Sequence, residues 1–146
     1  MSGRSLLFDS SVYIGIIRGD IEWNVIAVPM RAARVRLASV VAFELLVGAR
    51  TAADRQDLAA MIQRSEQSGW TITPGLRDWT TAADIVAWYT RRHGRIETRY
   101  HLADVLLVVC AGQVRGEIVT TNVRDLTRWA RAARRFDLDV RVSSPG

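Results

Sequence analysis

The 146-residue sequence predicts an α/β sandwich built around a largely parallel β-sheet. Short apolar runs that end abruptly in polar residues alternate with longer amphipathic stretches, as expected when each strand is followed by a helix that covers the sheet. The composition, 49% hydrophobic and 24% charged, is typical of a globular chain that is long enough for one real core. No repeat, low-complexity segment or linker interrupts it, so we expect one domain over residues 1–146.

Five short segments have the apolar, β-branched character of strands. We expect strands over Ser5–Asp9, Val35–Ser39, Trp70–Thr73 and Glu117–Thr121, with Leu138–Val142 as an edge strand. Their spacing leaves room for a crossover helix after each strand, which favours parallel pairing.

The segments between the strands show the apolar spacing of helices. We expect helices over Ser10–Ile17, Val40–Arg50, Thr51–Ser68, Thr80–Arg92, Tyr100–Gly112 and Asn122–Arg134. Residues 21–34 are mixed in character, because Pro29 breaks any single long helix there. The Thr80–Arg92 helix is amphipathic, and its expected inward residues are Ala83, Val86, Ala87 and Trp88.

The bulk numbers limit the possible environment of the protein. The net charge is +5 and every basic side chain is arginine, so the surface favours polyanions, although plain solubility explains the charge equally well. The single cysteine, Cys110, lies in an apolar run and is expected to be a buried, inert thiol. Neither a signal peptide nor a transmembrane stretch is visible, so we expect a cytoplasmic protein with no membrane partner.

Four carboxylates stand at the borders of apolar runs, where an unpaired charge is costly. Asp9 ends the run Leu6–Phe8, Asp104 opens another run, and Asp125 follows a third. Each of these three acids has a plain structural explanation as a helix cap or as a first-turn acid that the helix dipole favours.

Glu44 is harder to explain as a surface residue. Its helical neighbours three and four positions away are Val40, Val41, Val47 and Gly48, so a surface position would expose an apolar face. In a parallel sheet, strand ends and the following helix starts meet at the carboxyl edge, which brings the four acids together. Two carboxylates about 4 Å apart repel by roughly 4 kcal/mol at an effective dielectric of 20. A divalent cation bound between the carboxylates turns this electrostatic repulsion into attraction. All-oxygen ligands select Mg²⁺ or Mn²⁺, and these ions promote phosphodiester hydrolysis.

Four segments carry a resemblance to a known family. They are Leu7–Ile14, Ser39–Gly48, Leu102–Asp104 and Val119–Leu126. In order, spacing and total length the chain resembles a PIN domain, in particular the ribonuclease toxin of a VapBC-type toxin–antitoxin pair. The resemblance covers nearly the whole chain and implies a PIN-like three-layer α/β/α sandwich with a central, mostly parallel sheet of about five strands. One departure is Leu126, where the family usually has Phe, and it affects packing rather than ligation.

The resemblance also implies a role for each acid. Asp9, Glu44, Asp104 and Asp125 correspond to the acidic quartet of the family, which is both catalytic and metal-binding. Asp9 and Asp104 would be the firmest ligands, Glu44 would bind or orient the metal-held water, and Asp125 would ligate directly or through water. Three side chains would hold these carboxylates in place by hydrogen bonds: Ser11, Thr121 and Asn122.

The implied activity is that of a Mg²⁺-dependent endoribonuclease, the toxic component of a type II toxin–antitoxin module. A VapB-type antitoxin and a homodimer, or a heterotetramer or larger assembly with the antitoxin, are implied as partners. The Thr51–Ser68 and Tyr100–Gly112 helices are candidates for the dimer face. Because the acidic site repels RNA, the basic side of the last helix is expected to guide it, through Arg124, Arg128 and Arg131.

Two other functions remain open at this point. The first is a catalytically inactive PIN-type module that binds RNA or protein. The second is an aspartyl-phosphate enzyme with Asp9 as nucleophile. The second is disfavoured because Ser11 stands where such phosphatases carry a further acid, and because receiver domains need a lysine that this chain lacks.

The remaining polar and aromatic residues have structural explanations. His93 and His101 are too sparse for a zinc site, although His101 is near enough to Asp104 in sequence to touch substrate. The five tryptophans are expected in the core or at interfaces, with Trp129 on the basic helix as the possible exception.

Overall fold

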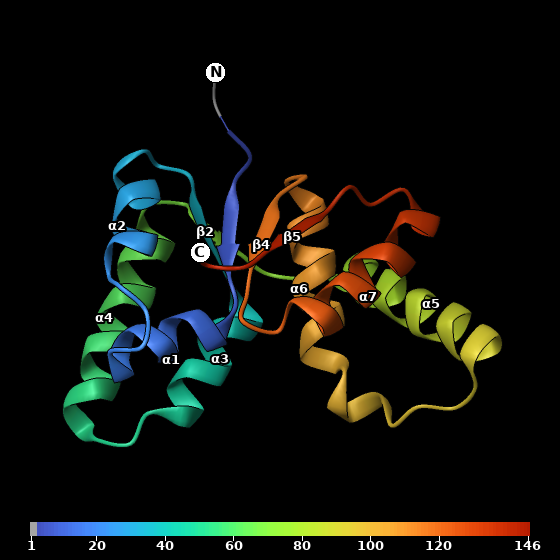
Figure 1. Ribbon diagram of the computed structural model, residues 1–146, viewed down its shortest axis with the longest axis horizontal. Coiled ribbons are helices and arrows are strands. Elements are labelled where there is room, and N and C mark those ends of the chain that lie inside the picture. Colours follow the sequence, from blue (N-terminus) through green and yellow to red (C-terminus); the bar gives the residue numbers. More distant parts are fainter. Residues whose placement is uncertain (1–2) are drawn as a thin grey trace.

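The computed structural model describes residues 3–146 and contains one five-stranded sheet (Figure 1). The strands pair in the order β3-β2-β1-β4-β5, and every pair is parallel. Their bounds are β1 (Leu6–Phe8), β2 (Val35–Ala38), β3 (Thr71–Ile72), β4 (Glu117–Val119) and β5 (Arg141–Ser143). The predicted parallel sheet is confirmed, and the last strand lies at an edge, as expected.

Helices cover both faces of this sheet, so the predicted three-layer sandwich is also confirmed. They are α1 (Ser10–Arg18), α2 (Asn24–Arg31), α3 (Ser39–Gly48), α4 (Ala52–Gln67), α5 (Leu76–His93), α6 (Leu102–Gln113) and α7 (Val123–Ala133), with short 3₁₀ helices η1 (Thr98–Tyr100) and η2 (Arg134–Phe136). In Figure 1, α1, α2 and α4 lie to the left of the sheet, and α5, α6 and α7 lie to its right. Helix α3 lies below the sheet, where it packs against both α1 and α6.

Helix α5 differs from the sequence prediction in its start and its buried face. It begins at Leu76 rather than Thr80, because the Asp78 side chain accepts a hydrogen bond from the Gly75 N–H (2.9 Å) and so caps the first turn. Ala82 and Ile85 are buried, whereas Ala83, expected to face inward, is exposed. The apolar residues of this segment fit two possible buried faces, which differ by a rotation of one residue along the helix. Packing against α6 and α7 decides which face is buried.

Two smaller differences concern helix ends. Pro29 lies inside α2, which continues for two more residues to Arg31. Tyr100 belongs to the short helix η1, so α6 begins at Leu102, with His101 as its cap residue.

The core is centred on β1, β4 and α6. Leu7 on the central strand β1 and Ile118 on its neighbour β4 are fully buried, and every residue of α6 from Val105 to Ala111 is buried. Cys110 lies within that segment as a free thiol, and burial raises its pKa to about 12. The thiol therefore stays protonated near neutral pH, which agrees with the predicted inert cysteine. Because α6 is buried over this length, its middle is not available as a dimer face. Within residues 3–146, no helix combines the length and apolar character needed to cross a membrane.

Candidate acidic site at the carboxyl edge of the sheet

Asp9 is buried at the carboxyl edge of the sheet, where β1 and β4 end together. Phe8 pairs with Val119 across these strands, and the Asp9 N–H donates to the Val119 carbonyl (2.9 Å). The Asp9 side chain then caps α1, because its Oδ1 accepts from the Ser10 N–H (2.8 Å). Only 8% of the residue is exposed. The strand end and the helix start therefore hold this carboxylate in one orientation.

The second oxygen of Asp9 is held by two hydroxyl groups. Its Oδ2 accepts from the Thr120 hydroxyl (2.8 Å) and from the Ser11 hydroxyl (3.1 Å). The Thr120 oxygen in turn accepts from the Asn122 N–H (2.9 Å), and the Ser11 oxygen accepts from the Thr121 N–H (3.2 Å). The segment that follows β4 is thus tied to Asp9 through a small hydrogen-bond network.

Thr120 is the member of this network that the sequence analysis missed. Thr121, expected in this role, is exposed and contributes its backbone N–H, whereas Thr120 is fully buried and provides the hydroxyl. The signal was present in the strand register. If Phe8 pairs with Val119, the next residue on each strand, Asp9 and Thr120, must be neighbours at the sheet edge.

Asp125 is held by its own helix, α7. Its Oδ2 accepts from the Asn122 side-chain amide (3.1 Å), and its Oδ1 accepts from the Arg128 guanidinium (3.0 Å). Asn122 therefore supports Asp125 through its side chain and touches the Asp9 network only through its backbone. Arg128, expected to guide RNA, forms an ion pair at the edge of the acidic site.

Glu44 and Asp104 complete the site from α3 and α6. Burial raises the pKa of Glu44, the charge of Asp9 raises it further, and a hydrogen bond with the Ser10 side chain opposes the rise. Burial also raises the pKa of Asp104, which reaches about 6 with contributions from Asp9, Glu44 and Asp125; Arg128 opposes this rise. Such mutual effects require proximity, so the four acids predicted from the sequence share one electrostatic environment.

The donor set of this site has the chemistry of a hard-cation site. It consists of carboxylate and hydroxyl oxygens, which suit Mg²⁺ or Mn²⁺ better than softer metals. Within residues 3–146, however, no three side chains among Asp, Glu, His and Cys lie close enough to ligate one ion in their present positions. The four acids are therefore near one another, but their side chains are not arranged to ligate one ion.

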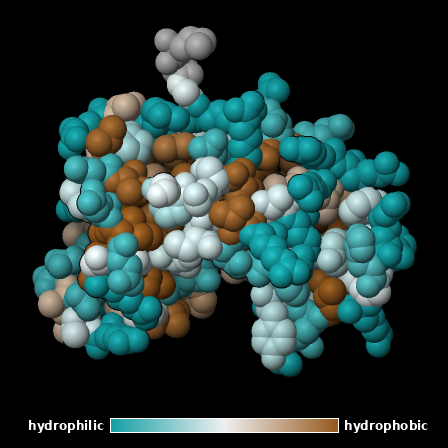
Figure 2. Space-filling view, in the orientation of Figure 1, coloured by the Kyte–Doolittle hydropathy of each residue, from teal (hydrophilic) through white to brown (hydrophobic). Residues whose placement is uncertain are grey.

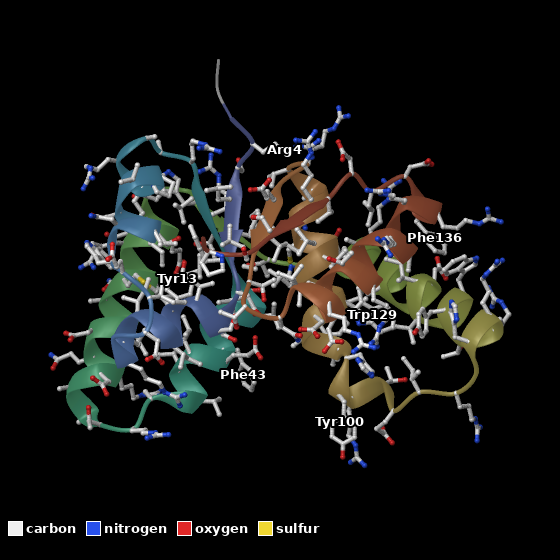
Figure 3. All side chains as sticks on the ribbon, viewed as in Figure 1. Arg4, Tyr13, Phe43, Tyr100, Trp129 and Phe136 are labelled. Carbon is white, nitrogen blue, oxygen red and sulfur yellow. The ribbon has the colours of Figure 1, made fainter. Side chains whose placement is uncertain are left out.

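The other residues singled out in the sequence lie outside this site. Trp129, considered the possible exception among the tryptophans, is instead a fully buried core residue (Figure 3). Its ring lies 5.5 Å from that of His101 and 4.8 Å from that of Tyr89. Trp129 therefore presents no surface to a nucleic-acid base. Arg124 and Arg131 are exposed on α7.

A second feature is an apolar groove between α1, α2 and α4. It has a volume of about 310 Å³ and is visible as hydrophobic surface on the left of Figure 2. Trp23 and Ile17 on its rim are more than half exposed. Its main apolar lining residues are Tyr13, Ile16, Ile17, Trp23, Met30 and Met61.

These features define an α/β domain of the PIN-like class: an all-parallel five-stranded sheet, helices on both faces, three acids next to strand ends or helix starts, and a fourth, Glu44, in the middle of α3. Comparison with solved structures agrees. The chain superimposes on a chain of the DNA-bound VapBC complex of Salmonella typhimurium with a TM-score of 0.69, at 16% identity, covering 99% of this chain and 100% of that one. The fold is therefore that of VapC-like PIN-domain toxins.

Two further complexes show the same likeness. For VapBC2 of Rickettsia felis, bound to a DNA fragment from its promoter, the TM-score is 0.66 at 12% identity, and 95% and 97% of the two chains are covered. For VapBC-5 of Mycobacterium tuberculosis the TM-score is 0.60 at 16% identity, and the match covers 97% of this chain and 99% of that one. No family model and no curated protein matches the sequence itself. At these identities the likeness establishes the shared fold.

Proposed function

We propose that the chain is the toxin of a VapBC-type pair and that it acts as a Mg²⁺-dependent endoribonuclease. The observation that carries this proposal is the meeting of four carboxylates from separate elements at one edge of the sheet: Asp9 after β1, Glu44 on α3, Asp104 on α6 and Asp125 on α7. The likeness of the fold to chains of VapBC complexes supports it.

In this proposal the four carboxylates hold Mg²⁺, for which Mn²⁺ can substitute. When bound, the cation would supply an activated water and the positive charge that stabilises the leaving oxygen of the RNA phosphodiester. Asp104 must be ionised to ligate, so its pKa of about 6 makes ion binding weaken below neutral pH.

The chain's own residues fix the geometry of the proposed reaction. Ser11 and Thr120 both donate to Oδ2 of Asp9 and so lock the rotation of this carboxylate. Glu44, from a different helix, would bind the ion or orient its water. Arg128 balances the charge of Asp125 and of its neighbours.

A VapB-type antitoxin is the proposed protein partner, and the apolar groove between α1, α2 and α4 is the surface we assign to it. Exposed apolar side chains such as Trp23 and Ile17 are typical of a surface that another protein covers. In the cell the pair would form a heterotetramer or a larger assembly of toxin dimers. Co-expression with the antitoxin should yield a stable complex.

The decisive experiment is cleavage of total cellular RNA by the purified chain, free of partner, in Mg²⁺, in Mn²⁺ and in EDTA. We expect discrete fragments with either ion and none in EDTA. Asp9→Asn should reduce cleavage at least 100-fold. Asparagine caps a helix as well as aspartate does, so this variant keeps the start of α1 and should remain folded.

Asp20→Asn is the matched control, because Asp20 is an exposed acid away from the sheet edge. It should cut RNA like the parent chain. Equal cleavage by Asp9→Asn and the parent would overturn the proposal.

The second candidate, an inactive PIN-type binding module, is favoured by one observation: the acids are not gathered around one point. Thermal melting in increasing Mn²⁺ separates the two. A metallo-ribonuclease should melt at a higher temperature in Mn²⁺, and the rise should be lost in Asp9→Asn. A binding module should show no rise in either chain.

A further inference from the structure

We infer that a pocket enclosed by α1, α2, α4 and β2 binds a small aromatic carboxylate, with the carboxylate on a tyrosine hydroxyl and an arginine. The pocket has a volume of about 260 Å³, below the usual range for drug-sized ligands, so it suits a molecule of one or two rings. We call it the Tyr13 pocket, and its main lining residues are Tyr13, Met30, Leu37, Met61, Arg64 and Trp70.

The hydroxyl of Tyr13 is the first feature that indicates a polar ligand. Only 7% of Tyr13 is exposed, and Figure 3 shows this residue between α4 and the sheet. Within residues 3–146 no side-chain hydrogen bond involves its hydroxyl. Burial raises the pKa of this hydroxyl well above its usual range, so it stays protonated and can donate. Because buried polar groups are nearly always hydrogen-bonded, an acceptor in the pocket would complete its contacts.

Arg64 supplies a positive charge at the mouth of the pocket. It is exposed on α4, and it is the one charged side chain among the described residues that line the pocket. It forms no ion pair within the described part of the chain, not even with Asp57, which lies two helical turns away on α4. A guanidinium without a counter-charge beside a buried hydroxyl favours a carboxylate, which accepts from both donors.

The polar and apolar lining residues lie at different ends of the Tyr13 pocket. Tyr13 and Arg64 also line the apolar groove between α1, α2 and α4, so they lie where the two cavities meet. Val35, Leu37 and Trp70 line the pocket but not that groove, so they form its far end. Val35 and Leu37 are buried on β2, and Trp70 is half-buried. The ligand therefore needs an anionic group at one end and an apolar body at the other.

The two methionines favour an aromatic body. Met30 and Met61 are half-buried on facing helices, and their thioethers make favourable contacts with ring edges. Trp70 adds a ring against which a second ring can pack. A nucleotide fits less well, because its phosphates would have only the single charge of Arg64 to neutralise them.

A ligand in the Tyr13 pocket would also affect the proposed antitoxin surface. The pocket shares Tyr13, Met30, Met61 and Arg64 with the apolar groove assigned to the antitoxin, so the two partners would compete for these side chains. This consequence rests on the proposed function, whereas binding of the carboxylate does not.

The test compares naphthoate with naphthamide, its neutral counterpart of the same shape, on the full chain. Two of the three methionines line the pocket, so NMR of chain labelled with ¹³C-methyl methionine reports on the site itself. We expect the methyl resonances of Met30 and Met61, assigned by substitution with Leu, to shift and saturate together as naphthoate is added. Naphthamide should bind about tenfold more weakly, because it carries no charge.

Substitutions separate the two polar contacts. Tyr13→Phe keeps the ring, removes the hydroxyl and should weaken naphthoate binding by about tenfold. Arg64→Gln should weaken naphthoate binding by about threefold to tenfold and leave naphthamide binding unchanged, and Arg64→Lys should restore most of the loss. Arg91→Gln is the control, since Arg91 is exposed on α5 across the sheet from the pocket in Figure 1, and it should bind naphthoate like the parent chain.

Three results would overturn the inference: no saturable shift of both methionines at millimolar naphthoate, naphthamide binding as tight as naphthoate, or an equal loss in Arg64→Gln and Arg91→Gln. The second result would mean that the pocket accepts any apolar group, as a surface for a protein segment does. The proposed function fails separately, because RNA cleavage does not enter this measurement. A chain that binds naphthoate as expected but cuts no RNA would keep the pocket and lose only the ribonuclease.

Discussion

At the scale of single residues, Asp104 carries its charge at a cost to stability. Burial and three neighbouring carboxylates raise its pKa from the ordinary value of 3.8 to about 6. The folded chain therefore binds the Asp104 proton more tightly than the unfolded chain does. As the pH rises from about 4 to about 6, ionisation of Asp104 therefore lowers the free energy of unfolding. Above that range the loss in free energy caused by Asp104 stays constant.

Replacing Asp104 by Asn should relieve this penalty. In EDTA at pH 7.5 we expect Asp104→Asn to be more stable than the parent chain by about 1–2 kcal/mol, a value reduced for the partial exposure of the side chain. At pH 4 the two chains should be nearly equal. Urea denaturation at both pH values measures the difference. A difference that does not change with pH would mean that the charge of Asp104 is not its cause.

Thr120 is the second residue whose role can be isolated. Its hydroxyl donates to Asp9 and accepts from the Asn122 N–H, so Thr120→Val leaves both partners with one hydrogen bond fewer. We expect a loss of about 1–3 kcal/mol in the free energy of unfolding and a loss of metal-dependent RNA cleavage of about 10–100-fold.

Thr121→Val is the control, since the same substitution at the adjacent, exposed residue removes no side-chain contact to Asp9. Urea denaturation and the RNA cleavage assay should both be close to those of the parent chain. Equal effects of the two substitutions would contradict the role given to Thr120.

At the scale of elements, Trp129 joins three helical segments. It lies on α7, packs on Tyr89 of α5, and faces His101 at the start of α6. It is fully buried, yet its indole Nε1 has no hydrogen-bond partner in the described structure. Its contribution is therefore that of a large apolar ring rather than that of a donor.

This assignment predicts different effects for two substitutions. Trp129→Phe keeps an aromatic ring and removes an unpaired polar group, so it should cost less than about 1.5 kcal/mol. Trp129→Ala leaves a cavity among three helices and should cost about 3–5 kcal/mol. Chemical denaturation of both variants measures this. If phenylalanine cost as much as alanine, the indole N–H would have a role that its contacts do not show.

At the scale of the whole molecule, apolar side chains flank the edge that carries the acids. Phe43 and Val47 on α3 are 68% and 70% exposed, and Tyr100 is 75% exposed. Figure 3 shows Phe43 and Tyr100 on the same lower side of the molecule. Exposed apolar groups clustered in this way are typical of a protein interface. We therefore assign the proposed homodimer contact to this edge rather than to the buried middle of α6.

Phe43→Asp should break this contact, because a buried unpaired charge at an interface costs more than a dimer of ordinary size can tolerate. Light scattering after size-exclusion chromatography should show a halved mass relative to the parent chain. Val28→Asp is the control at a similarly exposed apolar residue, on α2. A parent chain that is already monomeric, or a Phe43→Asp variant that stays dimeric, would contradict the assignment.

The sequence was most informative about the order and type of the elements. Short apolar runs predicted the first four strands, whereas β5 lies at Arg141–Ser143 and overlaps the expected Leu138–Val142 in two residues only. Thr51, whose hydroxyl accepts from the Asp54 N–H (3.0 Å), caps α4 where the helix was expected to start. The inner face of α5 was less certain, because neighbouring apolar residues such as Ala82 and Ala83 fit two helical faces equally well. Local periodicity reports the kind of element, whereas its rotation depends on the partners against which it packs.

The sequence by itself determined that Asp9 follows a strand and that Asp104 and Asp125 lie in the first turns of helices, and in a parallel α/β sheet this favours one shared edge. Glu44 lies in the middle of α3, and it joins them because α3 packs against α1 and α6. Only the tertiary structure decided that Thr120 rather than Thr121 holds Asp9, and that Arg128 pairs with Asp125. The physical reason is the range of the interactions. Strand and helix patterns arise from neighbours along the chain, whereas strand register, side-chain direction and the raised pKa of Asp104 arise from groups that only folding brings together.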